Sequence, residues 1–160
     1  MLSPIEPLTA LDDILALLAT CDLPLSDIDA NQPPQFFGMR DEAGLVALVG
    51  LEHFGSVALL RSLAVAPSHR GLGLAVQLVS FIEQHAHAQG ADRLFLLTTS
   101  AAVLFARLGY LPTARSAAPP AIQTTAQFSG LCPASSAFLC KALGGLESRS
   151  AGAILEVNRQ

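Results

Sequence analysis

Cations are scarce in this sequence of 160 residues. Lysine and arginine together number 9 against 13 aspartates and glutamates, which gives a formal net charge of −4, and Lys141 is the only lysine. A protein that binds the phosphate backbone of DNA or RNA needs clustered cations to displace counterions, so we expect no nucleic-acid partner. The hydrophobic fraction of 51% and the charged fraction of 14% predict a folded chain with a sizeable core, within the length of one domain.

Long apolar runs and paired cysteines are also missing. The longest apolar runs, such as Ile14–Ala19 and Leu45–Val49, are far shorter than the roughly 18 residues of a membrane span. The first seven residues lack the basic and apolar segments of a signal peptide. Three cysteines, without C-x-x-C spacing, predict reduced thiols. We therefore expect a cytoplasmic protein with no membrane partner; its high hydrophobic content is compatible with a homodimer.

The first half of the chain predicts antiparallel strands. A short strand and a helix with apolar positions at helical spacing from Leu11 to Ala19 come first. Strand candidates follow at Gln35–Arg40, Leu45–Phe54 and Ser56–Val65, joined by short turns that favour hairpins. The last of these is apolar on both faces around Arg61, which predicts a central position in a sheet.

The second half alternates helices with strands. Apolar positions from Leu74 to Ala86 follow a helical period, with Glu83 off the apolar face. A helix and a strand after a central strand predict a β-α-β unit with a parallel crossover. The further elements that we expect are a strand at Arg93–Thr98, a helix at Ala101–Leu108, a strand from Tyr110, a short helix at Ala121–Phe128 and a last strand at Ser136–Lys141. Residues 1–143 form the predicted domain, and residues 144–160 a C-terminal tail.

Glycines open the helix that follows the central strand. The strand ends at Val65-Ala66-Pro67, and the helix begins within Arg70-Gly71-Leu72-Gly73-Leu74-Ala75. Glycine lets a ligand approach the backbone, and the first N–H groups of a helix form an anion site suited to a pyrophosphate. From the glycine spacing alone, an ordinary strand–helix turn remains the alternative. The segment lacks the lysine of a Walker A loop, and the preceding hairpins do not fit a dinucleotide-binding unit.

Two motifs in this order resemble the GNAT superfamily of N-acetyltransferases. Arg70–Ala75 resembles its Arg/Gln-x-x-Gly-x-Gly/Ala acyl-CoA signature, led in by Leu63–Pro67, and Leu104–Tyr110 resembles its later helix. The resemblance covers about Glu6 to Leu143. It implies an α/β fold with a mixed, mostly antiparallel central sheet, a β-α-β acyl-CoA-binding unit and splayed central strands. Leu60–Val65, Leu96–Thr99 and Phe128–Ser135 further resemble the small N-acetyltransferases of arsenic-resistance operons.

The resemblance implies acetyl-CoA as the donor and no metal. It places pantetheine in the gap between the splayed strands and the pyrophosphate against the glycine-containing loop. In many superfamily members a tyrosine at the position of Phe105 protonates the leaving thiolate; phenylalanine has no proton to give, so the thiol is expected to leave without that acid or through water. The residues implied in binding the cofactor are Leu63, Val65, Arg70, Gly71, Leu72, Gly73, Leu74, Ala75 and Phe105.

Four residues are candidates for catalysis or for acceptor binding. Glu52 is the candidate base, or a carboxylate that relays through water; its alternative is a solvated acid at a strand end. Arg61 needs a partner because burying an unpaired guanidinium is costly, and that partner is either a substrate carboxylate or an internal salt bridge, for example to Glu52. Thr98 and Thr99 offer hydroxyls to pantetheine or acceptor; otherwise Thr99 or Ser100 caps the next helix.

Together these residues predict an acetyl-CoA-dependent N-acetyltransferase acting on the amine of a small amino-acid-like molecule. The resemblance suggests an organoarsenical or a phosphinic glutamate analogue, and hence arsenic resistance. The alternative is a non-catalytic acyl-CoA-binding or metalloid-sensing module, with Cys132 and Cys140 as soft ligands. Acetylation of protein termini or lysines would need an open groove, and the loop Ala114–Pro133 is long enough to cover the acceptor side.

Overall fold

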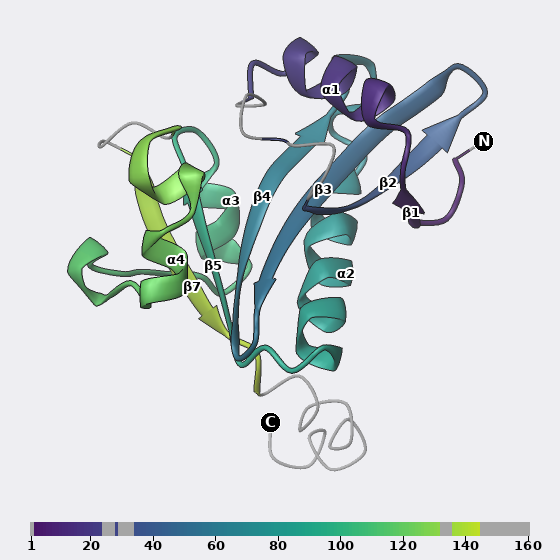
Figure 1. The fold of residues 1–160 in the computed structure, drawn as a ribbon. Coiled ribbons are helices and arrows are strands. Elements are labelled where there is room, and N and C mark those ends of the chain that lie inside the picture. Colours follow the sequence, from purple (N-terminus) through teal and green to yellow (C-terminus); the bar gives the residue numbers. More distant parts are fainter. Residues whose placement is uncertain (1, 24–27, 29–33, 132–135, 145–160) are drawn as a thin grey trace.

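The computed structural model describes residues 2–23, 28, 34–131 and 136–144. In that part of the chain the strands form one sheet, and helices pack on both of its faces (Figure 1). The strands are β1 (Glu6–Leu8), β2 (Gln35–Asp41), β3 (Gly44–Phe54), β4 (Val57–Val65), β5 (Arg93–Thr98), β6 (Leu111–Pro112) and β7 (Ala137–Ala142). The helices are α1 (Leu11–Thr20), α2 (Leu74–Ala88), α3 (Ala102–Arg107) and α4 (Pro120–Gln123).

The sheet has seven strands in the order β1-β2-β3-β4-β5-β7-β6. Strands β4 and β5 pair in parallel, and the other neighbouring pairs of described strands are antiparallel. Helix α2 connects β4 to β5, which is the predicted β-α-β unit. The β4–β5 pairing extends only from Val57–Arg93 to Leu59–Phe95, and beyond it the two strands separate. This confirms the predicted α/β fold with a mixed, mostly antiparallel sheet and splayed central strands.

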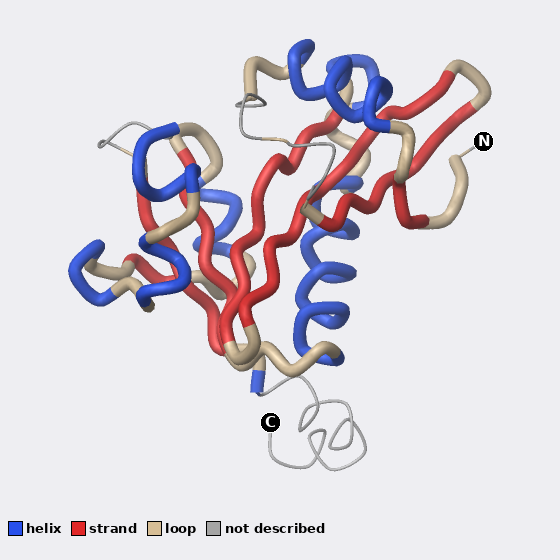
Figure 2. Tube along the Cα trace, in the orientation of Figure 1, coloured by secondary structure: helices blue, strands red, loops and turns tan. Residues whose placement is uncertain are grey.

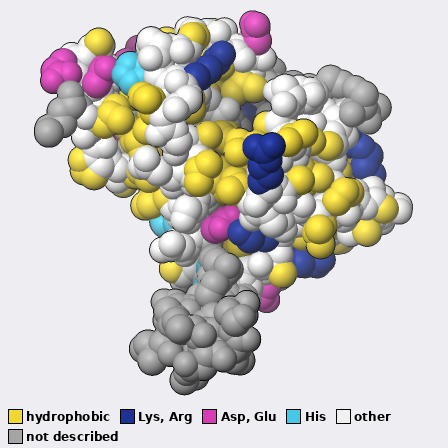
Figure 3. Space-filling view, turned by 180° about the vertical axis from the view of Figure 1, so that it is seen from behind, with side chains coloured by type: hydrophobic (Ala, Val, Ile, Leu, Met, Phe, Trp, Pro, Cys, Tyr) yellow, Lys and Arg dark blue, Asp and Glu magenta, His cyan; other side chains and the backbone are white. Residues whose placement is uncertain are grey.

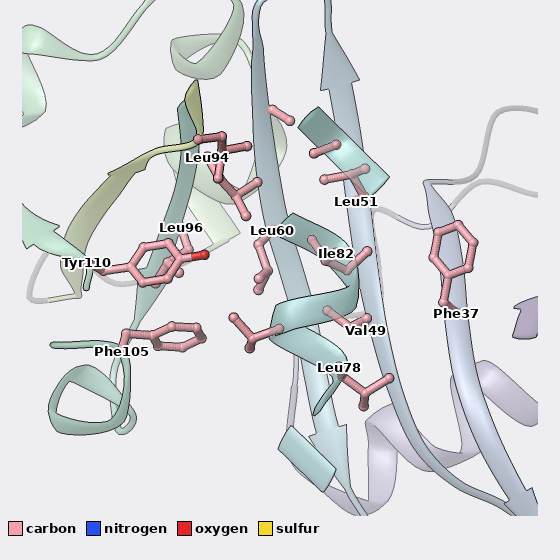
Figure 4. Packing of buried hydrophobic residues seen from close by; sticks show 14 of the residues in the cluster. Phe37, Val49, Leu51, Leu60, Leu78, Ile82, Leu94, Leu96, Phe105 and Tyr110 are labelled. Carbon is pink, nitrogen blue, oxygen red and sulfur yellow. The ribbon is translucent and has the colours of Figure 1, made fainter. Parts of the chain in front are cut away.

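The largest buried cluster lies between the sheet and α2. Leu78 and Ile82 of α2 pack against strand residues such as Leu60 and Leu94, as Figure 4 shows. All four side chains are at least 96% buried. Fully burying an aliphatic side chain contributes about 1.5–3 kcal/mol, so this face fixes the position of α2 against β4.

The other face of the sheet carries two separate apolar clusters. One lies under α1 and includes Ile14 and Ala64, and the other lies under α4 and includes Leu59 and Ile122. Along β4, Arg61 falls between Leu59 and Ala64, and so between the two clusters. A charged side chain therefore occupies the part of this face that neither α1 nor α4 covers with apolar side chains.

The helix expected at Ala121–Phe128 is shorter in the structure. Helix α4 makes one turn from Pro120 to Gln123, and a wide π-turn spans Gln127–Leu131 (Figure 2). Tyr110 lies just before β6 and is buried. Residues 145–160 of the predicted tail (144–160) and Cys132 lie outside the described residues. No helix within the described ranges is both long enough and apolar enough to cross a lipid bilayer.

Candidate functional site

The loop between β4 and α2 presents an open helix N-terminus. Gly71 and Gly73 have φ angles of +81° and +80°, which other residues rarely adopt, and Gly73 is the N-cap residue of α2 without a side-chain capping hydrogen bond. A Cβ atom added at either glycine would meet no other atom within 4 Å. The backbone is therefore uncovered where the first N–H groups of α2 point outward. This arrangement fits a pyrophosphate, as the sequence predicts.

The side chains around this loop differ in their exposure. Leu72 is 59% exposed, whereas Leu74 is 3% exposed and packs in the core, so Leu74 can offer a ligand only its backbone. Arg70 donates from Nε to the Val65 carbonyl at 3.0 Å and from Nη2 to the Cys21 thiol at 3.7 Å. These contacts tie the loop to the end of β4.

Strand β4 contains a bulge where it leaves β5. Leu48 pairs with Ala64 and Gly50 pairs with Arg61, so β4 has one more residue than β3 between these pairs. Ser62, in the bulge, has a φ of +58°. Leu63 lies beyond the last β4–β5 pair, as does Val65 of the predicted cofactor set. Backbone groups on this side of β4 are placed to pair with an extended ligand, as in strand addition.

Arg61 and Glu52 form an ion pair on the face of the sheet opposite α2. The Arg61 Nη1 donates to Glu52 Oε2 at 2.9 Å, and its Nε donates to Ser62 Oγ at 3.0 Å. The Arg61 side chain is 1% exposed and that of Glu52 is 22% exposed. Gly50 makes room for the pair, since a Cβ there would lie 3.1 Å from Arg61 Cγ. The internal salt bridge that the sequence left as an alternative is thus present, with the carboxylate as its more exposed member.

An open cleft of about 860 Å³ lies beside this pair. Its lining includes Glu52, Phe54 and Arg61 of the sheet and Thr124–Ala126, directly after α4. The volume lies within the range of small-molecule sites. Among its lining residues Glu52 and Arg61 carry the formal charges, and the carboxylate of Glu52 is the more exposed of the two groups.

Uncharged polar groups, among them Gln35, His53 and Gln89, also line the cleft. Gln35 Nε2 donates to Gln89 Oε1 at 3.3 Å, and His85 Nε2 lies 3.0 Å from Gln35 Oε1. Burial lowers the pKa of His85, with a smaller contribution from His53. The His53 Nε2 is buried and has no hydrogen-bond partner among the described residues. A polar acceptor side chain would find both donors and acceptors here.

The two threonines after β5 differ in their roles. Thr98 Oγ1 accepts from the backbone N–H of Ala101 at 2.9 Å and of Ser100 at 3.3 Å, so Thr98 caps the turn before α3. The alternative expectation, that Thr99 or Ser100 caps the following helix, is wrong, because Thr98 accepts these hydrogen bonds. Thr99 is exposed. The Thr98 oxygen is thus occupied as an acceptor, while its hydroxyl proton remains able to donate.

Phe105 lies in the core beside Tyr110. The two rings make an edge contact with centroids 5.3 Å apart, and Figure 4 shows both on the α2 side of the sheet. Tyr110 Oη donates to Glu83 Oε2 at 2.8 Å, and burial, followed by Glu83, raises the pKa of Tyr110 far above its usual value. Tyr110 holds its proton firmly and is a packing residue, as the sequence indicates.

A buried polar group that the sequence missed links α2 to β7. Glu83 is 6% exposed although its position falls off the apolar face of α2. Lys141 Nζ donates to both Glu83 oxygens, at 3.1 and 3.0 Å, and to the Leu108 carbonyl at 2.8 Å. The sequence feature that could have revealed this contact is Lys141, because a single lysine in a buried strand requires a carboxylate partner.

Thiols and basic side chains are dispersed over the described structure. Cys21 and Cys140 are free thiols, and burial raises the pKa of Cys140. No group of three or more His, Cys, Asp or Glu side chains within the described ranges could hold a metal ion. On the face shown in Figure 3, Lys and Arg side chains are spread out among apolar ones. The candidate metalloid ligand Cys132 lies outside the described residues.

Comparisons with known proteins agree with this geometry. The model of the acetyltransferase (GNAT) family matches residues 8–110. A protein named as an uncharacterized N-acetyltransferase, YobR of Bacillus subtilis, is 31% identical over 88 residues, which cover 51% of this chain and 36% of YobR. N-acetylglutamate synthase from Neisseria gonorrhoeae, solved with coenzyme A and L-arginine, aligns with a TM-score of 0.72 and 21% identity over 89% of this chain and 33% of the synthase.

A third similarity covers nearly the whole of a shorter protein. Rv2747 from Mycobacterium tuberculosis, solved in complex with CoA, aligns with a TM-score of 0.68 and 16% identity over 88% of this chain and 99% of Rv2747. The chain therefore spans about a third of YobR and of the synthase, but almost all of Rv2747. At these identities the solved structures show a shared fold.

Proposed function

The chain belongs to the acetyltransferase (GNAT) family. From that premise we propose that it transfers an acetyl group from acetyl-CoA to the amine of a small amino-acid-like molecule. The observation that carries the proposal is the uncapped N-terminus of α2, with Gly71 and Gly73 uncovered, directly beside the gap between β4 and β5. An anion site and an extended slot meet there, and a long thioester carrier with a diphosphate needs both.

Backbone groups form the proposed binding site of the acetyl donor. The N–H groups at the start of α2, around Gly71, Gly73 and Ala75, receive the diphosphate, and the helix dipole adds partial positive charge. The edge of β4 at Leu63 and Val65 pairs with the amide groups of pantetheine. When bound, acetyl-CoA supplies the thioester carbonyl carbon that the acceptor amine attacks.

The Glu52–Arg61 pair forms the proposed binding site of the amine that accepts the acetyl group. Arg61 holds a carboxylate or a similar oxyanion of the acceptor through its planar fork, and Glu52 accepts the proton that the amine loses, directly or through one water. A C–N bond forms and the C–S bond breaks. The thiolate then takes a proton from water, since Phe105 has none to give. Thr98 and Thr99 line the approach from β5.

The proposed acceptor class follows from this pair. An amine that also carries an oxyanion matches one carboxylate and one guanidinium in the same cleft. The resemblance to the acetyltransferases of arsenic-resistance operons selects an organoarsenical and a phosphinic glutamate analogue as the first acceptors to assay. Peptide amines are less well matched, because a peptide amine need not carry the oxyanion that the Glu52–Arg61 pair would bind.

Thiol release tests the proposal. Purified protein with acetyl-CoA should release free thiol only when an acceptor is added, and the acetylated acceptor should appear in equal amount by mass spectrometry. The panel comprises amino acids, a phosphinic glutamate analogue, an amine-bearing organoarsenical and a peptide, against an acceptor-free blank. Tight acetyl-CoA binding with no acceptor-dependent release across the panel would favour the non-catalytic acyl-CoA-binding module instead.

A further inference from the structure

The carbonyl oxygen of Val65, at the end of β4, already accepts two hydrogen bonds from side chains. Arg70 Nε donates to it at 3.0 Å, and the thiol of Cys21 donates to it at 3.6 Å. Arg70 Nη2 also donates to the Cys21 sulfur at 3.7 Å. Since a carbonyl oxygen has two lone pairs, this oxygen has no lone pair left for a donor from a ligand.

Val65 directs its backbone groups toward the gap between β4 and β5. The N–H of the next residue, Ala66, donates to the Val46 carbonyl of β3 at 2.8 Å. Because successive residues of a strand turn their backbone groups to opposite edges, Val65 turns its N–H and its carbonyl away from β3. The β4–β5 pairing ends at Leu59–Phe95, so no described strand pairs with Val65 on that side. Val65 therefore belongs to the edge that is proposed to bind pantetheine.

The contacts of Arg70 join three separate elements. Cys21 is the C-cap residue of α1, Val65 is the last residue of β4, and Arg70 lies in the loop before α2. A guanidinium in a loop that binds a diphosphate would ordinarily be expected to bind phosphate. Here two of its three nitrogens donate within the protein, and they do so at the strand that is proposed to bind the pantetheine half of the carrier.

A second set of contacts holds the same loop independently of Arg70. His69 Nε2 lies 3.0 Å from Asp41 Oδ2 at the β2–β3 turn, and the His69 N–H donates to the Ala66 carbonyl at 2.9 Å. Asp41 is itself anchored, because its Oδ1 accepts from the N–H of Ala43 at 2.8 Å. Removal of the Arg70 side chain should therefore leave the loop in place and take a donor away from Val65.

We propose that Arg70, together with Cys21, is a positioning residue for the pantetheine part of the donor and acts through Val65. The inference rests on the proposed acetyl-CoA function. With its oxygen occupied, Val65 offers the carrier only its N–H group, which requires an amide carbonyl oxygen of pantetheine as its partner. The two side chains thus fix the end of β4 and determine which kind of group can bind there.

Two substitutions of Arg70 separate positioning from phosphate binding. Calorimetric titration with coenzyme A measures Kd at salt concentrations of about 0.05 and 0.5 M. Arg70→Ala should raise Kd about fivefold at both concentrations, because the hydrogen bond that it loses is to a backbone carbonyl. Arg70→Gln has no charge but keeps an N–H donor for Val65, so its Kd should stay within about twofold of the wild-type value. Arg93→Gln removes the same charge at the start of β5, where β4 and β5 are paired, and is the matched control that should bind like the wild type.

The chemical shifts of Val65 report on the two side chains directly. In protein labelled with nitrogen-15 and carbon-13, coenzyme A should move the amide proton of Val65 and leave its carbonyl carbon nearly unchanged, since the oxygen keeps both donors. Cys21→Ala frees one lone pair, so the carbonyl carbon should then shift as well on binding. Cys21→Ser keeps a donor at this position and should behave like the wild type.

Three results would overturn the inference and leave the proposed function standing. If both Arg70 variants weaken binding equally, and more strongly at low salt, Arg70 binds phosphate. If neither variant changes Kd, Arg70 has no role in binding the donor. If coenzyme A moves the Val65 carbonyl carbon as far in the wild type as in Cys21→Ala, the oxygen is open to the ligand. Failure of coenzyme A to bind the wild type at either salt concentration would overturn the proposed function as well.

Discussion

Arg61 shows how one side chain defines a site. A guanidinium in an otherwise apolar strand requires a partner, and the structure supplies Glu52 at 2.9 Å. The pair lies between the apolar cluster under α1 and the one under α4, so the sheet face is polar where a cleft reaches it. In the proposed complex, the amine of an acceptor would contact Glu52 and its oxyanion would contact Arg61. Both charged side chains would then keep a partner.

Substitutions of the pair should separate acceptor binding from proton transfer. Arg61→Ala should raise the acceptor KM about 30-fold, because a hydrogen bond to a charged group contributes about 2 kcal/mol, and should change the acetyl-CoA KM less than about twofold. Glu52→Gln should mainly lower kcat, by about 100-fold. Steady-state kinetics with both substrates measures the split.

Arg61→Lys provides the control for charge alone. Lysine keeps the positive charge but not the planar fork, so its acceptor KM should fall between those of the wild type and Arg61→Ala. If Arg61→Ala folds normally and leaves both the acceptor KM and kcat unchanged, Arg61 has no role in acceptor binding.

At the scale of elements, α2 is held from two sides. Its apolar stripe packs on the sheet, and Glu83 on its flank reaches Lys141 of β7 and Tyr110 before β6. The second set of contacts ties α2 to β7 and to the residue before β6, and so fixes it relative to the strands beyond β5.

Lys141→Met should lower the free energy of unfolding by about 3 kcal/mol, because it leaves Glu83 buried without a counter-charge. Adding Glu83→Gln should recover most of this loss, since a neutral amide still accepts from Tyr110. Arg40→Met, which breaks a surface pair, should cost less than about 1 kcal/mol. Urea denaturation gives all three values; equal losses for Lys141→Met and Arg40→Met would contradict a structural role for the buried pair.

Much of the fold could be predicted from periodicity and turn residues. Strand β5 has the predicted bounds, and β2, β3 and β4 differ from prediction by one residue at an end, because glycine turns and apolar runs mark hairpins locally. The short α4 and its π-turn could not be predicted in this way, since Pro119 and Pro120 fix only where the helix begins. Glu83 was missed because a helical stripe does not show that a flanking carboxylate meets a lysine 58 residues away.

The candidate site, like the fold, could be predicted only where it depends on local sequence. The glycine loop could be predicted because backbone conformation there depends on local residue types, and both glycines do have positive φ angles. The Glu52–Arg61 pair was one of two alternatives, because the choice depends on strand register. The cap at Thr98 and the Asp41–His69 contact could not be predicted, since each depends on where separate turns meet in space.

At the scale of the whole molecule, the donor and acceptor regions meet through β4. Its end leads into the diphosphate loop, its bulge faces the gap toward β5, and its Arg61 faces the cleft on the side opposite α2. In the proposed reaction, one strand therefore connects the carrier, the thioester and the amine. We propose above all that backbone N–H groups at the start of α2 bind the carrier's diphosphate.

Amide chemical shifts measured during a coenzyme A titration of nitrogen-15-labelled protein test that claim most directly. We expect saturable shifts that are largest for the N–H groups of Gly71, Gly73 and Ala75, because a phosphate hydrogen bond deshields the amide proton, with smaller shifts at Leu63 of β4. Saturable binding that leaves the amides of residues 71–75 unmoved would contradict the account.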